Sequence, residues 1–215
     1  MKIAILIIIS ILCRQNNIFC QLPNFENNFT KNDSISSPLL DSFSKEFNFV
    51  FAYMEQASPN HNYKILAKKN TKWSYWTFSD NYLQWTKKDN IYKVDTIRVG
   101  TFWEGKKSIT TKQADEILEF LNQNNFWKLR NDSLNQSRVT EKYYDDENGG
   151  TIFTQDKGPT DQINYRFEVY KIKNCRVIES YGPDYFVEKY PNLYDRKKFI
   201  NCRDKFLKWW EMYCR

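Results

Sequence analysis

The segment from Thr110 to Leu129 is the feature that most restricts what this chain can fold into. Thr110, with Gln113 three positions later, predicts a capping box at the start of a helix, and Asn124 and Asn125 are expected to end it. The apolar residues between these ends have the i, i+3, i+4, i+7 spacing of one helical face: Ala114, Ile117, Leu118 and Leu121. Such a face must be buried against another layer, so we expect a sheet beneath this helix.

Segments on both sides of this helix predict the strands of that sheet. Tyr63–Ala67, Trp73–Phe78 and Ile91–Val99 are rich in aromatic and β-branched residues, and Ile163–Ile172 with Cys175–Tyr181 predict the two arms of a hairpin. Alternation in the hairpin favours antiparallel pairing, and no β-α-β succession suggests a parallel sheet. The predicted fold class is therefore α+β, with an antiparallel, twisted sheet that carries the central helix and is flanked by N- and C-terminal helices.

Helices are predicted near both ends of the chain. Ser37-Pro38 predicts a helix start, and the apolar stripe that follows continues as far as Ser58-Pro59: Leu40, Phe43, Phe47, Val50, Phe51 and Met54. Asp195 is expected to cap the last helix, which places Phe199, Cys202, Phe206, Trp210 and Tyr213 inward and Lys198, Lys205 and Lys208 outward. Residues 131–137 and 145–150 are expected to be loops with at most a short strand nearby, and Tyr185–Tyr194 a loop packed on the core.

The first residues predict export. Lys2 precedes an apolar run from Ile3 to Leu12, which is too short to span a bilayer but typical of a signal peptide. We expect residues 1–20 to be a signal peptide cleaved near Cys20, residues 21–37 a flexible tether, and residues 38–215 a single α+β domain. The alternatives are a buried N-terminal segment or a lipid-modified cysteine. The predicted location is periplasmic or at the cell surface, without a stable membrane span.

Export bears on the cysteines that remain in the mature chain: Cys175, Cys202 and Cys214. Outside the cytoplasm a disulfide is permitted. Cys202 and Cys214 on one helix are roughly 18 Å apart, which is too far to bond. A disulfide therefore requires Cys175, with Cys202 as its candidate partner, and three unpaired thiols in the core are the alternative.

Charge and motifs exclude several classes of function. The formal net charge of +6 falls to +4 without the leader, which carries Lys2 and Arg14 and no acidic residue. The basic residues gather on the last helix. Basic residues on a helix usually form a solvent-exposed face, so nucleic acid is not an expected partner. The sequence contains no CxxC, HExxH, P-loop or GxGxxG motif, and no cofactor or metal is expected.

Few residues offer chemistry. The single histidine, His61, lies in a polar junction without the surroundings of a catalytic triad. The acidic loop Tyr143–Gly150 has the carboxylates that Ca²⁺ prefers but not the EF-hand spacing, so we interpret it as a solvated turn. Glu168 and Glu179 are the one carboxylate pair that the predicted hairpin brings together. We expect both to be exposed, with arginine or lysine partners: Arg166, Arg176 or Lys171.

An aromatic tract offers the best candidate for ligand binding. Trp73, Tyr75, Trp76 and Trp85 are candidates for a platform that binds carbohydrate or peptide, although aromatic residues at strand spacing also build a core. The leading hypothesis is a non-catalytic binding or interaction module whose partner is an envelope glycan or protein. The alternative is a cell-envelope hydrolase that uses a pair of carboxylates.

The general layout resembles a known group of proteins. The leader ending in Cys20-Gln21, the composition rich in Lys, Asn and Ile, and the segment Phe126–Leu129 after a helix are similar to small exported proteins of unassigned function in Bacteroidetes-type bacteria. Asp33-Ser34-Ile35 and Asp132-Ser133-Leu134 resemble the triplets that such bacteria O-glycosylate. Sequons for N-glycosylation, relevant to a eukaryotic source, begin at Asn28, Asn32, Asn131 and Asn135. The resemblance implies export and brings no catalytic residues.

Overall fold

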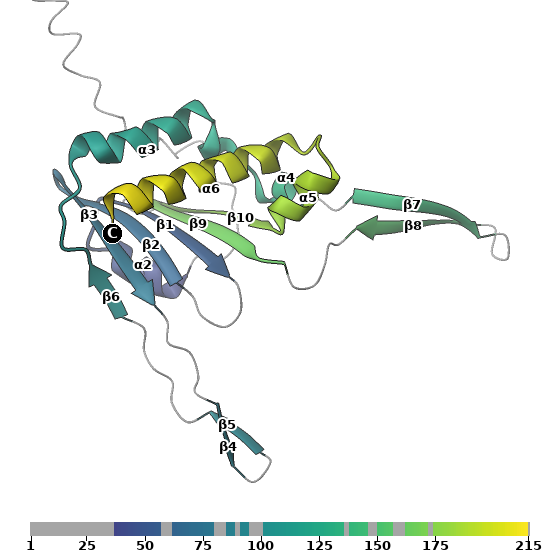
Figure 1. The fold of residues 1–215 in the computed structure, drawn as a ribbon, viewed down its shortest axis with the longest axis horizontal. Coiled ribbons are helices and arrows are strands. Elements are labelled where there is room, and N and C mark those ends of the chain that lie inside the picture. The colour runs from purple at the N-terminus through teal and green to yellow at the C-terminus, as the bar shows by residue number, and fades with distance from the viewer. Residues whose placement is uncertain are drawn as a thin grey trace, which may run out of the picture.

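The fold is organised around a six-stranded sheet in which every neighbouring pair of strands is antiparallel (Figure 1). The computed structural model describes residues 37–56, 62–79, 85–88, 91–94, 101–135, 138–145, 150–156, 162–171 and 174–214. The strands follow the order β10-β9-β1-β2-β3-β6. Their bounds are β1 Phe49–Gln56, β2 Asn62–Lys69, β3 Lys72–Ser79, β6 Thr101–Glu104, β9 Asn164–Lys171 and β10 Asn174–Tyr181.

Two hairpins form two-stranded sheets of their own (Figure 1). One pairs β4 (Trp85–Lys88) with β5 (Ile91–Val94), and the other pairs β7 (Arg138–Asp145) with β8 (Gly150–Asp156). The expectation of loops with at most a short strand after residue 137 is therefore wrong. Cross-strand pairing of β7 with β8 stabilises both segments as strands.

The two faces of the main sheet are covered unequally (Figure 1). Helices α3 (Thr111–Gln123) and α6 (Tyr194–Tyr213) lie side by side over one face, together with the 3-10 helix η1 (Phe126–Lys128). The short helix α2 (Pro38–Ser44) packs against the other face. Alternate residues of the four inner strands β9, β1, β2 and β3 therefore enter two different apolar clusters. The predicted α+β class, with an antiparallel sheet, a central helix and helices at both ends, is confirmed.

Helix α3 has the capping box and the buried face that the sequence predicts. The backbone N–H of Thr110 donates to Gln113 Oε1 over 2.8 Å, and the N–H of Gln113 donates to Thr110 Oγ1 over 3.3 Å. The predicted stripe is fully buried: Ala114, Ile117, Leu118 and Leu121. Asn125 then adopts a left-handed conformation with φ of 52°, which turns the chain into η1.

The predicted helix from residue 38 to Ser58-Pro59 is wrong beyond its first turns. The helix ends at Ser44, and Phe49–Gln56 is the strand β1 between β9 and β2. The first six residues of β1 are all buried, because the sheet is covered on both faces. A strand with two buried faces shows no alternation, and its apolar run fits a helical stripe equally well.

Two further segments predicted as loops contain helices. Pro183–Lys189 forms α5, which starts after Gly182 in a left-handed conformation with φ of 50°. Asn131–Leu134 forms the short helix α4. The last helix, α6, buries the predicted residues Phe199, Cys202, Phe206 and Trp210, and Trp209 in addition.

Helix α4 closes one edge of the sheet with side-chain amides. Asn131 Nδ2 donates to Val177 O over 3.1 Å, and the backbone N–H of Glu179 donates to Asn131 Oδ1 over 3.0 Å. Asn135 repeats the pattern: its Nδ2 donates to Glu179 O, and the N–H of Tyr181 donates to its Oδ1, both over 3.0 Å. The two amides, one helical turn apart, thus bond to β10 as a neighbouring strand does.

Candidate functional site

The four aromatic residues predicted to bind a ligand do not form one platform. Trp73 and Tyr75 belong to the cluster beneath α3 and α6, whereas Trp76 packs against the cluster beneath α2. Successive side chains of a strand point to opposite faces, so this separation follows from their odd and even positions in β3. Trp85 belongs to β4, and its side chain lies outside the described part of the structure.

Tyr75 is a core residue. Its ring packs edge-on against Trp210, with 5.6 Å between ring centroids and 87° between the planes. The same ring fills the space beside Gly105, where a Cβ atom would overlap it. The backbone N–H of Gly105 donates to Tyr75 O over 2.8 Å, so Tyr75 fixes the path of the chain that passes it. Its function is structural.

Trp73 and Trp76 both contribute to a groove of about 830 Å³ beside the first half of β3. Its walls come from the chain before β1, the turn between β2 and β3, and the segment that follows β6. The complete lining is Glu46, Phe47, Lys69, Asn70, Thr71, Lys72, Trp73, Ser74, Trp76, Glu104, Gly105, Lys106, Lys107 and Ser108. The sequence pattern indicates the tryptophans only, because the other members come from separate segments.

The groove exists because the segment after β6 separates from β3 between two points where it is bonded to that strand. β6 pairs with β3 as far as Trp76↔Glu104, and an isolated bridge joins Trp73 to Ile109. The intervening residues Lys106–Ser108 bend away from the strand and are exposed. Gly105 permits this departure because it has no side chain to collide with the Tyr75 ring. The loop therefore forms the outer wall of the groove.

Trp76 and Phe47 form the aromatic part of the lining. The indole Nε1 of Trp76 donates to Ser74 Oγ over 2.9 Å, which fixes the ring orientation. The rings of Phe47 and Trp76 meet edge to face, with centroids 6.0 Å apart and 75° between the planes. Both side chains are only partly buried, so each keeps accessible ring surface. Trp73 is only 4% exposed and contributes mainly to the core.

The groove carries an excess of positive charge. Four lysines and two glutamates line it. Lys69 Nζ lies 3.9 Å from Glu46 Oε2, but both side chains are largely exposed, so this pair is weak. Within the described part of the chain, Lys72 and Lys106 make no ion pair with a carboxylate. Two ammonium groups are thus left to meet an incoming anion.

The carboxylate pair considered for hydrolysis is part of a buried ionic cluster under α2. Arg166 Nε lies 2.9 Å from Glu168 Oε1, and Arg166 Nη1 lies 2.9 Å from Glu179 Oε2. Glu168 is 0% exposed, so the expectation that it is exposed is wrong, although Arg166 is its partner as predicted. Burial lowers the pKa of Arg166, but the charges of both glutamates outweigh it and the net pKa is raised. One guanidinium thus binds both carboxylates.

Two more groups complete the bonding of Glu168. The hydroxyl of Tyr170 donates to Glu168 Oε2 over 2.7 Å, and the backbone N–H of Ser37 donates to the same oxygen over 2.9 Å. Burial and the charge of Glu168 raise the pKa of Tyr170, and the same two causes raise the pKa of Tyr63 to about 12. Burial and the neighbouring Glu168 therefore hold both phenols in the neutral form.

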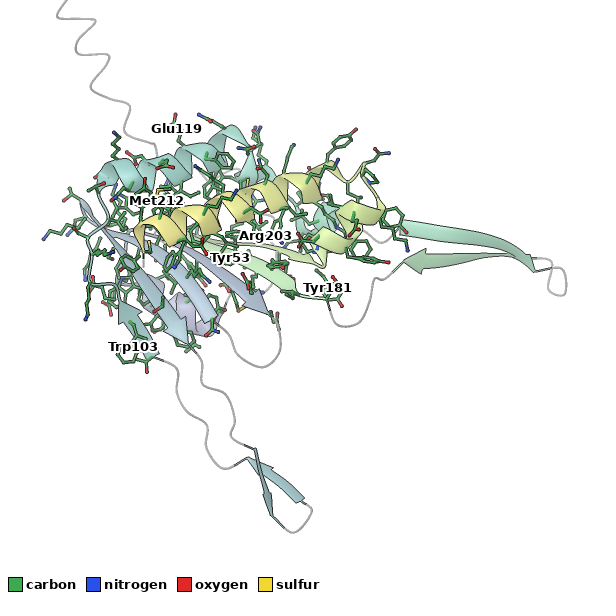
Figure 2. The ribbon with its side chains drawn as sticks, viewed as in Figure 1. Tyr53, Trp103, Glu119, Tyr181, Arg203 and Met212 are labelled. Carbon is green, nitrogen blue, oxygen red and sulfur yellow. The ribbon has the colours of Figure 1, made fainter. Side chains whose placement is uncertain are left out.

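A second ionic cluster ties α5 and α6 to the sheet. Arg203 binds Asp184 through both Nη atoms at 2.5 and 2.7 Å, and its Nε donates to Asp204 over 2.8 Å. Its guanidinium stacks over Tyr165, 4.4 Å from the ring centroid. Figure 2 shows Arg203 and Tyr53 between α6 and the strands. Bidentate pairing fixes geometry, so this cluster is structural.

The candidate disulfide is not formed. Cys175 packs against the cluster on the α2 side of the sheet, whereas Cys202 and Cys214 lie in the cluster on the opposite side. Among the described residues no disulfide joins Cys175 to Cys202. Burial raises the pKa of the Cys202 and Cys214 thiols to about 12, so both stay protonated and inert at neutral pH.

The residues predicted to carry glycans differ in their surroundings. Ser133 Oγ donates to Asp195 Oδ2 over 2.7 Å, and the amides of Asn131 and Asn135 are bonded to β10. Three groups considered from the sequence lie outside the described residues: His61, Asp146–Gly149 in the acidic loop, and the sites before residue 37. Modification of Ser133 or Asn131 in the folded chain therefore requires these hydrogen bonds to break.

The described helices include none that is long and apolar enough to cross a bilayer. In the same part of the chain, no group of three or more His, Cys, Asp or Glu side chains is placed to hold a metal ion. Comparison with models of protein families, with curated proteins and with solved structures found no match to this chain.

Proposed function

We propose that this protein is an exported, non-catalytic binding module that holds an envelope ligand in the groove beside β3. The observation that carries the proposal is the lining of the groove. It combines the partly buried rings of Phe47 and Trp76 with Lys72 and Lys106, which make no ion pair with a carboxylate of the described residues. Binding sites typically combine apolar or aromatic walls with a few polar groups that orient the ligand. The groove also lies within the usual size range of ligand sites.

The hydrolase alternative gains no support from its candidate carboxylates. Acid-base cleavage of a glycoside needs two carboxyl groups that flank an accessible bond. Glu168 is fully buried, and Arg166 binds both Glu168 and Glu179. A substrate therefore has no access to Glu168, and the arginine already occupies an oxygen of each carboxylate.

Export is supported by the composition of the first twelve residues, with a lysine before an apolar run. We expect the protein isolated from its native host to begin near Gln21, which mass spectrometry of the intact protein measures directly. An intact Met1 would contradict export with cleavage. A lipid-modified cysteine would show that the exported protein is anchored to a membrane and is not released.

Binding is tested by comparing alanine variants of a tryptophan inside the groove and a tryptophan outside it. The wild-type protein and its Trp76→Ala and Trp103→Ala variants are passed over immobilised envelope polysaccharides and envelope protein extracts. Trp103 is the matched control because it is 64% exposed on β6 and does not line the groove (Figure 2). We expect Trp76→Ala to lose binding and Trp103→Ala to keep it.

The melting temperature of each variant distinguishes lost binding from lost folding, and Trp76→Phe provides a second variant that keeps an aromatic ring. Equal binding by Trp76→Ala and wild type would contradict the proposed site. Binding that Trp103→Ala alone abolishes would move the site to the β6 edge.

A further inference from the structure

The groove gives chemical information about its ligand, and we propose that this ligand is an acidic glycan, a chain of sugar units that carry carboxylates. The inference rests on the proposed function and names the ligand class for the same site. It follows from three kinds of group in the lining, which occur together within the groove: ammonium groups, aromatic rings, and short polar side chains with two carboxylates.

The ammonium groups favour a ligand with negative charge. Lysines from the β2–β3 turn and from the loop after β6 face the same space: Lys69, Lys72, Lys106 and Lys107. An ammonium is a compact charge on a flexible stem, which accepts carboxylates in varied positions rather than in one fixed planar geometry. No arginine is among the described residues that line the groove, so these residues do not supply the rigid fork that recognises phosphate bidentately.

The aromatic rings favour a sugar. Phe47 and Trp76 line the groove and are only partly buried, and Trp76 is held in place by its hydrogen bond to Ser74. A pyranose ring has an apolar C–H face that packs on an aromatic ring while its polar rim stays hydrogen-bonded. A simple inorganic anion does not use this surface.

The remaining polar groups favour hydroxyls. Glu46 and Glu104 accept hydrogen bonds, Thr71 and Ser108 both donate and accept, and the Asn70 amide does both. The two carboxylates in the lining are suitable acceptors for sugar hydroxyls, which polyphosphate does not offer. A glycan with both hydroxyls and carboxylates is the ligand that uses the whole lining.

The test uses oligogalacturonate as the acidic probe and its fully methyl-esterified form as the neutral control. Both have the same chain, so they differ only in carboxylate charge. We expect isothermal titration to show that the acid binds roughly three- to tenfold more tightly than the ester, in keeping with a few exposed ion pairs. Raising the salt from about 20 mM to about 200 mM is expected to remove most of this difference.

Two double variants locate the effect. Lys72→Gln with Lys106→Gln is expected to reduce binding of the acid to that of the ester, without changing binding of the ester. Lys198→Gln with Lys208→Gln removes the same charge from the exposed side of α6, outside the groove, and is expected to leave both affinities unchanged.

The outcomes separate this inference from the proposed function. If acid and ester bind equally and Trp76→Ala abolishes both, the groove binds glycans but the acidic preference is wrong. If neither binds while RNA or polyphosphate does, and Lys72→Gln with Lys106→Gln abolishes that binding, the ligand is a phosphate polymer and the inference fails. If Trp76→Ala leaves every affinity unchanged, the proposed site itself is wrong.

Discussion

At the residue scale, Glu168 joins strand β9 to the start of α2 at one buried point. Its carboxylate bonds to Arg166 on the same strand, to the Tyr170 hydroxyl, and to the backbone of Ser37 at the start of α2. Arg166 also carries the link to β10 through Glu179. A buried charge is tolerated only when it is paired and hydrogen-bonded. The Glu168 carboxylate therefore needs the Ser37 N–H, and the same hydrogen bond holds the start of α2 in place.

Glu168→Gln is therefore expected to destabilise the protein by about 3–5 kcal/mol, because it leaves the Arg166 charge poorly compensated in a buried site. Urea unfolding followed by circular dichroism measures the change. Glu119→Gln is the control, since Glu119 lies on the exposed face of α3 (Figure 2) and is expected to cost less than about 0.5 kcal/mol. Equal stability of Glu168→Gln and wild type would show that the network is dispensable.

The buried phenols predict how stability depends on pH. The pKa of Tyr63 rises from 10.0 to about 12 on folding, because burial and the Glu168 charge disfavour the phenolate. The unfolded state then releases its proton first, so the free energy of unfolding falls as the pH rises from about 10 to about 12. We expect unfolding at pH 8, 10 and 11 to show this loss, with a shallower slope in Tyr63→Phe. An identical slope in that variant would contradict the assignment.

At the element scale, the two edges of the sheet are treated differently. The β10 edge is bonded to the amides of Asn131 and Asn135, whereas the other edge is the four-residue strand β6. An open edge invites pairing with a second chain, and proteins protect such edges with short strands or covering elements. Here one edge is covered and the other is short.

Replacing both asparagines with alanine removes four hydrogen bonds to β10. We expect the double variant to lose roughly 2–4 kcal/mol of stability, since each lost bond is worth about 0.5–1.5 kcal/mol and water replaces part of it. We also expect self-association, measured by light scattering during gel filtration. Asn192→Ala, an exposed change elsewhere, should do neither. A monomer with wild-type stability would show that the amides do not protect the edge.

At the scale of the whole molecule, the sheet is stable because both of its faces are covered, mainly by α3 and α6 on one side (Figure 1). Helix α6 supplies buried aromatic side chains to the central cluster: Phe199, Phe206, Trp209 and Trp210. Burial of each aromatic side chain is worth roughly 2 kcal/mol or more. Their sum is comparable to the net stability of a domain.

Truncation before Phe199 is therefore expected to abolish cooperative unfolding, observed by differential scanning calorimetry. The matched surface change is the triple variant Lys198→Gln, Lys205→Gln and Lys208→Gln, which should remain folded. Lys205 contacts Glu116 at 3.1 Å, but both side chains are substantially exposed, so its loss costs less than about 1 kcal/mol. A truncated chain that still unfolds cooperatively would show that α6 is peripheral.

The sequence by itself determined the elements that depend on interactions between residues close together in the chain. Helix α3 follows from a capping box and a stripe only a few residues apart, and the β9–β10 pair follows from two alternating segments that are close in the sequence. The buried residues of α6 follow from their helical spacing. In each case the interactions that decide the structure lie within one or two turns or across one hairpin.

Only the tertiary structure decided β1 and the groove. The apolar run Phe49–Met54 suits a helix or a strand, and it is a strand because β2 and β9 bond to both of its edges. The groove joins Phe47, Trp76 and Lys106, residues from three segments that meet only after the sheet has formed. Glu168 is buried for the same reason, since α2 covers it from far away in the chain. Interactions between distant segments leave no local pattern, so their consequences appear only in the folded molecule.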